Sequence, residues 1–223
     1  KEKIYKFQAI ADYLQEKFNE KNIHFDVEIP KDINNAINLI NNNKLDIFVD
    51  SIYSTIEVQK KSDISILAKR WKKGIEDYRS VVFVKKNSNL NNLADLKGKT
   101  IAFEDEFSTS GYFIPKKVME LQGLKVSQDG KKDSINYDYS RSEENTFAWV
   151  IYSKVVAGVT DDKTFQSYDN NMFKIIYKSG LIPRHLVSFS NKINPQLRDE
   201  ILDILYSMDT NDKGKESLKV FSK

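Results

Sequence analysis

Helical and strand patterns alternate along this chain, and this alternation restricts the possible folds more than any other feature. Residues 3–18 carry apolar side chains at three- and four-residue steps, which predicts an amphipathic helix. Residues 24–29 alternate between polar and apolar, which predicts a half-buried strand. A helix at 33–41 and a buried strand at 45–49 follow. The alternation predicts a parallel α/β sheet.

The same alternation continues to the end of the chain. Binding sites in parallel sheets lie at the carboxyl ends of strands, so Asp50, Ser51 and Tyr53 become candidates after the strand at 45–49. The polar stretch 128–138 is expected to be a loop. Further strands are expected at 64–67, 79–84, 100–103, 155–160, 173–177 and 186–189, and further helices at 112–122, 143–152, 163–168 and 195–208, the last element.

Composition excludes several classes of protein. The 223 residues are 40% hydrophobic and 30% charged, which is typical of a globular chain with a core and not of a disordered one. The net charge of +3 comes from interspersed charges, which argues against a nucleic-acid partner. There is no cysteine and only His24 and His185, so we expect no thiol chemistry, no metal site and no cofactor.

The segment Ser108, Thr109, Ser110 and Gly111 lies between an expected strand and an expected helix. Free amides and the positive end of the helix dipole meet at such a point and attract anions. Three hydroxyl groups add donors, and the glycine lets the backbone approach a ligand, so the segment suits a tetrahedral oxyanion. The alternative is an ordinary serine cap and a polar turn. Pro115 predicts an irregular first turn or a later helix start, because it removes a helical hydrogen bond.

Residues 104–115, EDEFSTSGYFIP, closely resemble the signature of the phosphate/phosphite/phosphonate periplasmic binding protein family of ABC transporters. Residues 77–84, 93–99, 142–159 and 182–187 resemble further segments of that family in the same order. The family begins with a strand where this chain begins with a helix, so a strand with its signal or anchor is expected to be missing. Residues 140–144 differ from the sequence of phosphonate-binding members, and the resemblance therefore does not carry over the identity of the ligand.

The resemblance implies an α/β type II periplasmic binding protein fold, in which two lobes joined by two hinge crossings close on a ligand, here without the first strand. Lobe I is expected to comprise residues 1–82 and 184–223, and the inserted lobe II residues 83–183. Arg184 lies at the second crossing and could reach the cleft, although no arginine is required. The ligand-binding residues that the resemblance implies, through hydroxyls and amides, are Ser108, Thr109, Ser110 and Gly111, with Tyr78 on the same anion and Tyr53 or Ser51 closing the pocket.

Acidic residues beside an oxyanion need a separate explanation, because a carboxylate repels a phosphoryl group. Glu143 and Glu144 lie at a helix start and Asp161 at a strand end. One interpretation is that the glutamates only stabilise the helix dipole. The other is that one or two of these three carboxylates hold the cationic end of a zwitterionic ligand, as in aminoalkylphosphonate-binding relatives.

The favoured function is that of a monomeric solute-binding protein that captures a phosphonate or related oxyanion between its lobes and delivers it to an ABC transporter permease. It would be periplasmic or extracytoplasmic, with membrane anchoring through a removed N-terminal segment left open. The alternative is the extracytoplasmic sensor domain of a receptor such as a histidine kinase. An enzyme is disfavoured, because the sequence shows no nucleophile and base pair and no Walker motif.

Overall fold

The computed structural model describes residues 2–71, 74–168 and 171–222 and shows a mixed α/β chain with two compact units. The first unit comprises Lys1–Asp50, Thr55–Ile75 and His185–Lys223. The second comprises the short segment Ser51–Ser54 and the long segment Glu76–Arg184. The long segment is inserted between two parts of the first unit. The lobe boundaries proposed from the sequence, after residues 82 and 183, stay a prediction.

The sheet of the first unit has the order β1-β11-β2, and both pairings are antiparallel. The prediction of a parallel sheet is therefore wrong for this unit. The reason is that β11 returns from the last third of the chain and lies between the two early strands, running against both. The elements are α1 (Glu2–Lys17), α2 (Ile33–Asn41), β1 (Ile47–Asp50), α3 (Ile52–Gln59), β2 (Ile64–Arg70), β11 (His185–Ser190), α7 (Pro195–Tyr206) and α8 (Asp212–Ser222).

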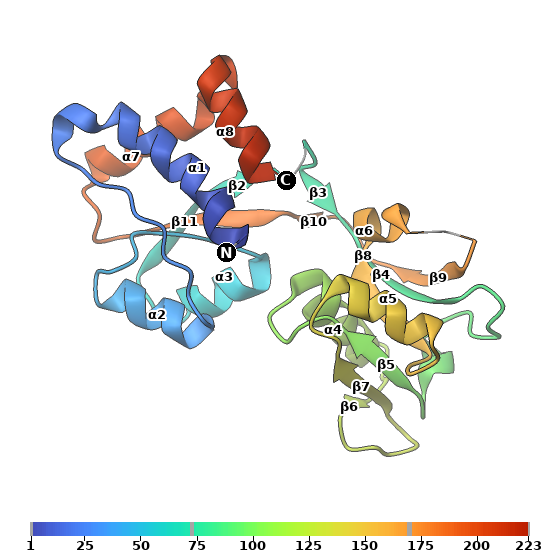
Figure 1. The fold of residues 1–223 in the computed structure, drawn as a ribbon. Helices are drawn as coiled ribbons and strands as arrows, with labels where there is room; N and C mark the ends of the chain where they lie inside the picture. The colour runs from blue at the N-terminus through green and yellow to red at the C-terminus, as the bar shows by residue number, and fades with distance from the viewer. Residues whose placement is uncertain (1, 72–73, 169–170, 223) are drawn as a thin grey trace. The chain divides into compact units, whose positions relative to one another are not determined.

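Helices cover both faces of this sheet, as Figure 1 shows. On one face, Ala36 and Ile40 of α2 pack with Phe48 of β1. On the other, Phe18, at the end of α1, packs with Phe189 of β11 and with α7. This layering is what the amphipathic pattern of the first helix predicts.

Three local expectations for the first unit are wrong. Residues 24–29 alternate in burial as expected, but no strand in the described part of the chain pairs with them. Instead the Gln15 side chain donates to the Ile23 carbonyl at 2.9 Å and accepts from the Phe25 N–H at 3.0 Å. The sequence reading also missed α3, and α8 follows the helix that was expected to be the last.

The second unit is built on a six-stranded mixed sheet of order β6-β7-β5-β8-β4-β9. β5 is parallel to β7 and β8, and β6 is parallel to β7, whereas β4 is antiparallel to β8 and β9. A separate antiparallel pair joins β3 and β10. The elements are β3 (Asp77–Tyr78), β4 (Ser80–Lys85), β5 (Thr100–Phe103), α4 (Ile114–Leu121), β6 (Val126–Ser127), β7 (Ile135–Tyr139), α5 (Glu143–Ile151), β8 (Ala157–Asp161), α6 (Asp162–Ser167), β9 (Phe173–Lys178) and β10 (Ile182–Pro183).

β7 corrects the loop expected at 128–138. Polar Asn136 and Asp138 alternate with apolar residues in this five-residue strand, which is the pattern of a half-buried strand, and the polar composition of the segment before it concealed the signal. β7 is hydrogen-bonded to β5 on one side and to β6 on the other. Pairing within the sheet therefore stabilises this strand despite its polar residues.

The two faces of this sheet bury separate apolar clusters. One contains Met119 of α4, and the other contains Phe147 of α5 and Phe165 of α6. Phe83 of β4 lies in the second cluster with no exposed surface and contacts Phe147 with ring centroids 4.5 Å apart. A Cβ atom on Gly158 of β8 would lie 2.6 Å from the Phe83 ring, so the glycine makes room for that ring. This cluster fixes α5, whose first turn carries Glu143 and Glu144, and α6, which is capped by Asp161.

Candidate ligand-binding site

The hydroxyl-rich segment forms a π-helical turn, Thr109–Phe113, between β5 and α4. Ser108 caps it, since its Oγ accepts the Gly111 N–H at 2.9 Å. The Phe113 N–H donates to the Ser108 carbonyl at 3.0 Å, five residues back. Regular α-helix begins only at Ile114, immediately before Pro115. The irregular start that Pro115 predicts is therefore confirmed.

Ser108 and Gly111 have a structural role in this turn. The Ser108 hydroxyl donates to Glu104 Oε2 at 2.9 Å, so its proton is already used. A Cβ atom at Gly111 would lie 2.6 Å from Glu104 Oε2 and 2.8 Å from Ser108 Oγ. The glycine is therefore required by its own neighbours, a reason different from the ligand approach proposed from the sequence.

Replacing Gly111 with alanine should lower the free energy of unfolding by about 1–3 kcal/mol, the usual cost of overpacking. The methyl group would displace the Glu104 carboxylate and break its hydrogen bond with Ser108. Gly180→Ala is the matched control, because a Cβ atom there has no neighbour within 4 Å. Urea denaturation of both variants measures the difference, and equal midpoints would refute the packing argument.

Ser51 and Tyr53 lie in the short segment Ser51–Ser54, which belongs to the second unit. The Tyr53 N–H donates to Thr109 Oγ1 at 2.9 Å. The Ser51 hydroxyl donates to the Phe107 carbonyl at 3.4 Å. The Tyr53 ring stacks on Phe113, with centroids 4.4 Å apart and planes at 13°. The structure thus brings Tyr53 to Thr109, and Ser51 to the carbonyl of Phe107 just before the turn.

Tyr78 of β3 is buried and hydrogen-bonded to the Ser110 side chain. Burial raises the pKa of Tyr78 above its usual value of 10.0, while the Ser110 hydrogen bond and the charge of Arg184 act in the opposite direction. The backbone of the turn is fixed here as well, because the buried Ser80 hydroxyl donates to the Ser110 carbonyl at 2.6 Å. The phenol keeps its proton at neutral pH and is a hydrogen-bond donor beside the turn.

Arg184 follows β10 and brings a positive charge to this group. Its guanidinium lies 4.3 Å from the centre of the Tyr78 ring, and its Nη2 lies 3.9 Å from Asp161 Oδ1. Arg184 and Asp161 are each 7% exposed. Within the described residues, the buried Nε of Arg184 has no hydrogen-bond partner. We call Tyr78, Ser110, Asp161 and Arg184 the Tyr78 cluster.

Sequence reasoning noticed Arg184 but did not include it among the site residues. The available signal was its place directly after Ile182 and Pro183 at a crossing, where a charged residue in a largely apolar stretch is unusual. Ile182 of β10 pairs with Tyr78 of β3, and this pairing brings the Arg184 side chain, two residues further on, to the Tyr78 ring. That pairing links residues about 100 positions apart, which a sequence pattern does not reveal.

The acidic candidates Asp161 and Glu143 are joined through Thr164. Asp161 Oδ1 accepts the N–H groups of Lys163 at 2.9 Å and Thr164 at 3.1 Å, so this carboxylate caps α6. The Thr164 hydroxyl lies 2.8 Å from Asp161 Oδ2 and 3.0 Å from Glu143 Oε1. Glu144, by contrast, is exposed. Both predicted carboxylates therefore have protein partners.

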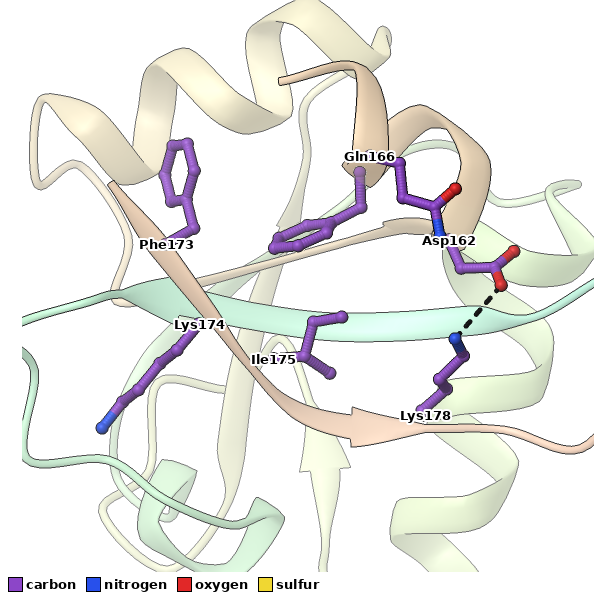
Figure 2. Close-up of a pocket in the computed structure, with 7 residues that line it drawn as sticks. Asp162, Gln166, Phe173, Lys174, Ile175 and Lys178 are labelled. Carbon is purple, nitrogen blue, oxygen red and sulfur yellow. Dashed lines mark ion pairs between the residues drawn. The ribbon is translucent and has the colours of Figure 1, made fainter. Parts of the chain in front are cut away.

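An open pocket of about 240 Å³ lies elsewhere on the second unit, between α6 and β9. Figure 2 shows that Asp162 faces Lys178 across it, with a closest distance of 3.3 Å. None of the predicted site residues lines this pocket, so it does not identify the ligand site. Its lining residues are Asp162, Phe165, Gln166, Phe173, Lys174, Ile175 and Lys178.

The described part of the chain contains no group of three or more histidine, cysteine or acidic residues arranged to hold a metal ion. Among the same residues, no helix has the length and apolar character that a bilayer crossing requires.

The fold is that of a type II periplasmic binding protein, as predicted, and solved binding proteins for phosphonates and sulphonates share it. The family described as "ABC transporter, phosphonate, periplasmic substrate-binding protein" matches residues 1–223. The chain belongs to this family, which confirms the resemblance drawn from residues 104–115 and the other segments. Its members are periplasmic binding proteins for small molecules, not enzymes, and they work with ABC transporter permeases.

Three solved structures illustrate the similarity. XAC2383 from Xanthomonas citri, bound to ATP, has a TM-score of 0.90 at 18% identity, covering 99% of this chain and 85% of its own. PhnD1 from Prochlorococcus marinus, in complex with methylphosphonate, has a TM-score of 0.75 at 17% identity, with coverage of 97% and 83%. A binding protein component of an ABC phosphonate transporter from Pseudomonas aeruginosa has a TM-score of 0.71 at 19% identity, with coverage of 97% and 74%.

Proposed function

We propose that this chain binds a phosphonate or a related tetrahedral oxyanion at the turn after Ser108 and at the Tyr78 cluster, and delivers it to an ABC transporter permease. The observation that carries the proposal is a buried arginine and a protonated tyrosine beside the hydroxyl-rich helix start, in a chain of the phosphonate-binding family. The position of the ligand between two lobes stays a prediction.

The donors of this site suit an anion. The Tyr78 hydroxyl keeps its proton, and the Arg184 Nε–H has no partner among the described residues. The first N–H groups of a helix have no acceptor within it, and in this turn the Gly111 N–H is taken by Ser108 Oγ. A hydrogen bond to a charged group contributes roughly 1.5–3 kcal/mol net. Three or four such bonds total about 5–12 kcal/mol, of which the entropy of association removes at least about 4 kcal/mol, so the tightest dissociation constant that they support alone is about 1 µM.

The remaining candidate residues form the surroundings of the anion in this proposal. Tyr53 and Ser51 provide a wall beside Thr109, where the Tyr53 ring already stacks on Phe113. Asp161 and Glu143 form the acidic side. The carboxylates do not prevent anion binding, because Asp161 is offset by Arg184 and by the start of α6.

Calorimetric titration of the purified protein with methylphosphonate, inorganic phosphate, methanesulfonate and ATP tests the proposal. We expect methylphosphonate to bind with a dissociation constant of about 1 µM to 1 mM, by the arithmetic above. ATP is included because XAC2383 was solved with it. Binding of ATP alone, or of none of the four compounds, would contradict the proposed function.

A further inference from the structure

We infer that Arg184 occupies the acidic side of the site, so that the ligand is a phosphonate or related oxyanion without a cationic amine. The inference rests on the proposed function and narrows its substrate class. It also decides between the two interpretations of Glu143 and Asp161 that the sequence left open.

The first argument is the number of bonds that Asp161 already accepts. A carboxylate offers about four lone-pair positions. Three are used by the Lys163 N–H, the Thr164 N–H and the Thr164 hydroxyl, at 2.9, 3.1 and 2.8 Å. The Arg184 guanidinium approaches Oδ1 at 3.9 Å. A ligand ammonium group would find little of this carboxylate still available.

The second argument is charge. Asp161 is buried, and a buried carboxylate needs a compensating cation or several hydrogen bonds. Arg184 is also buried and supplies that cation from within the protein. An ammonium group placed beside Asp161 would lie next to the guanidinium and be repelled by it.

The third argument is the unused donor of Arg184. Its Nε is buried and has no partner among the described residues, which is costly for a charged group. The Tyr78 ring, 4.3 Å away, fixes the plane of the guanidinium. An N–H donor of this kind suits an oxyanion, whereas an ammonium group could not accept from it.

Glu143 does not offer an alternative amine site. It lies in the first turn of α5, where a negative charge is favoured by the helix dipole. Its Oε1 lies 3.0 Å from the Thr164 hydroxyl, whose single proton goes to Asp161 Oδ2 at the shorter distance of 2.8 Å. The start of α5 therefore stabilises the Glu143 charge without a ligand cation.

The test compares methylphosphonate with 2-aminoethylphosphonate by calorimetry on the wild-type protein and on Arg184→Met, Asp161→Asn and Arg198→Met. We expect the wild type to prefer methylphosphonate by about tenfold or more. Arg184→Met should reduce or reverse this ratio, because Asp161 then lacks its cation. Asp161→Asn keeps a good helix cap and should bind methylphosphonate at least as tightly as the wild type. Arg198→Met, which removes an exposed ion pair on α7, should keep the wild-type ratio.

The outcomes separate the two claims. If the wild type binds both compounds equally or prefers 2-aminoethylphosphonate, and Asp161→Asn removes that binding, the inference is overturned while the proposed function stands. If neither compound binds, the inference fails, and the proposed function fails with it when inorganic phosphate and methanesulfonate do not bind either. The ratio of affinities is the decisive readout, since a general loss of folding lowers both affinities and leaves their ratio unchanged. Asp161→Asn decides the question should Arg184→Met fail to fold.

Discussion

Replacing Phe83 with alanine should lower the free energy of unfolding of the second unit by about 3–5 kcal/mol, the usual cost of removing a large aromatic side chain from a core. Phe83 has no exposed surface and contacts the rings of Phe147, Phe165 and Phe173 with centroids 4.5, 5.6 and 5.2 Å away. Those rings belong to or adjoin α5, α6 and β9, so a cavity here loosens three elements together.

Urea denaturation followed by the fluorescence of Trp149, which packs against this cluster, measures the effect. Trp71 is in the first unit and 55% exposed, so a Trp71→Phe background removes its signal. Tyr152→Ala is the control, because Tyr152 is 83% exposed and its loss should change stability by less than about 0.5 kcal/mol. A loss below about 1 kcal/mol for Phe83→Ala would show that this cluster does not hold the unit together.

Replacing Tyr78 with phenylalanine should weaken methylphosphonate binding by about 10- to 150-fold, equivalent to one hydrogen bond of roughly 1.5–3 kcal/mol to a charged group. The substitution removes only the hydroxyl and keeps the ring on which Arg184 lies. Because burial raises the pKa of Tyr78, the phenol is protonated at pH 7 and the lost group is a donor. Calorimetric titration at pH 7 gives the dissociation constant directly.

Tyr152→Phe is the matched control and should leave the dissociation constant unchanged, since Tyr152 is at the exposed end of α5. The thermal unfolding midpoint of Tyr78→Phe should be recorded alongside, because Ser110 loses its partner as well. A dissociation constant within twofold of the wild type would exclude the Tyr78 hydroxyl as a ligand donor.

Local patterns predicted much of the fold. The helix at 33–41 and the strand at 100–103 match α2 and β5 residue for residue, because an amphipathic face and a short apolar run each depend on neighbouring residues. The antiparallel course of β11 between β1 and β2 did not follow from such patterns, since it depends on pairing across more than 100 residues. α3 was missed for a different reason: its β-branched and hydroxyl residues have weak helix propensity and little amphipathic character.

In the candidate site, too, features that depend on neighbouring residues were predictable from the sequence, whereas contacts between distant residues were not. The segment 108–111 was recognisable because helix caps, glycine and Pro115 act on their immediate neighbours. The resemblance to the family then pointed to Tyr78. The partnership of Arg184 with Tyr78 and Asp161 was not predictable, because these three residues come from separate strands or strand ends and meet only through the pairing of β3 with β10 and the position of β8. Their roles in binding stay a proposal.

The π-turn at Thr109–Phe113 separates two tasks within one stretch of chain. Hydrogen bonds to Ser108 and Thr109 span five residues, and the four-residue pattern starts only with α4. The packing of α4, through buried Pro115 and Met119, is therefore set independently of the side chains in the turn. Under the proposed function, exchanging the hydroxyl groups at 109 and 110 would change the ligand that is bound without rebuilding the helix that supports them.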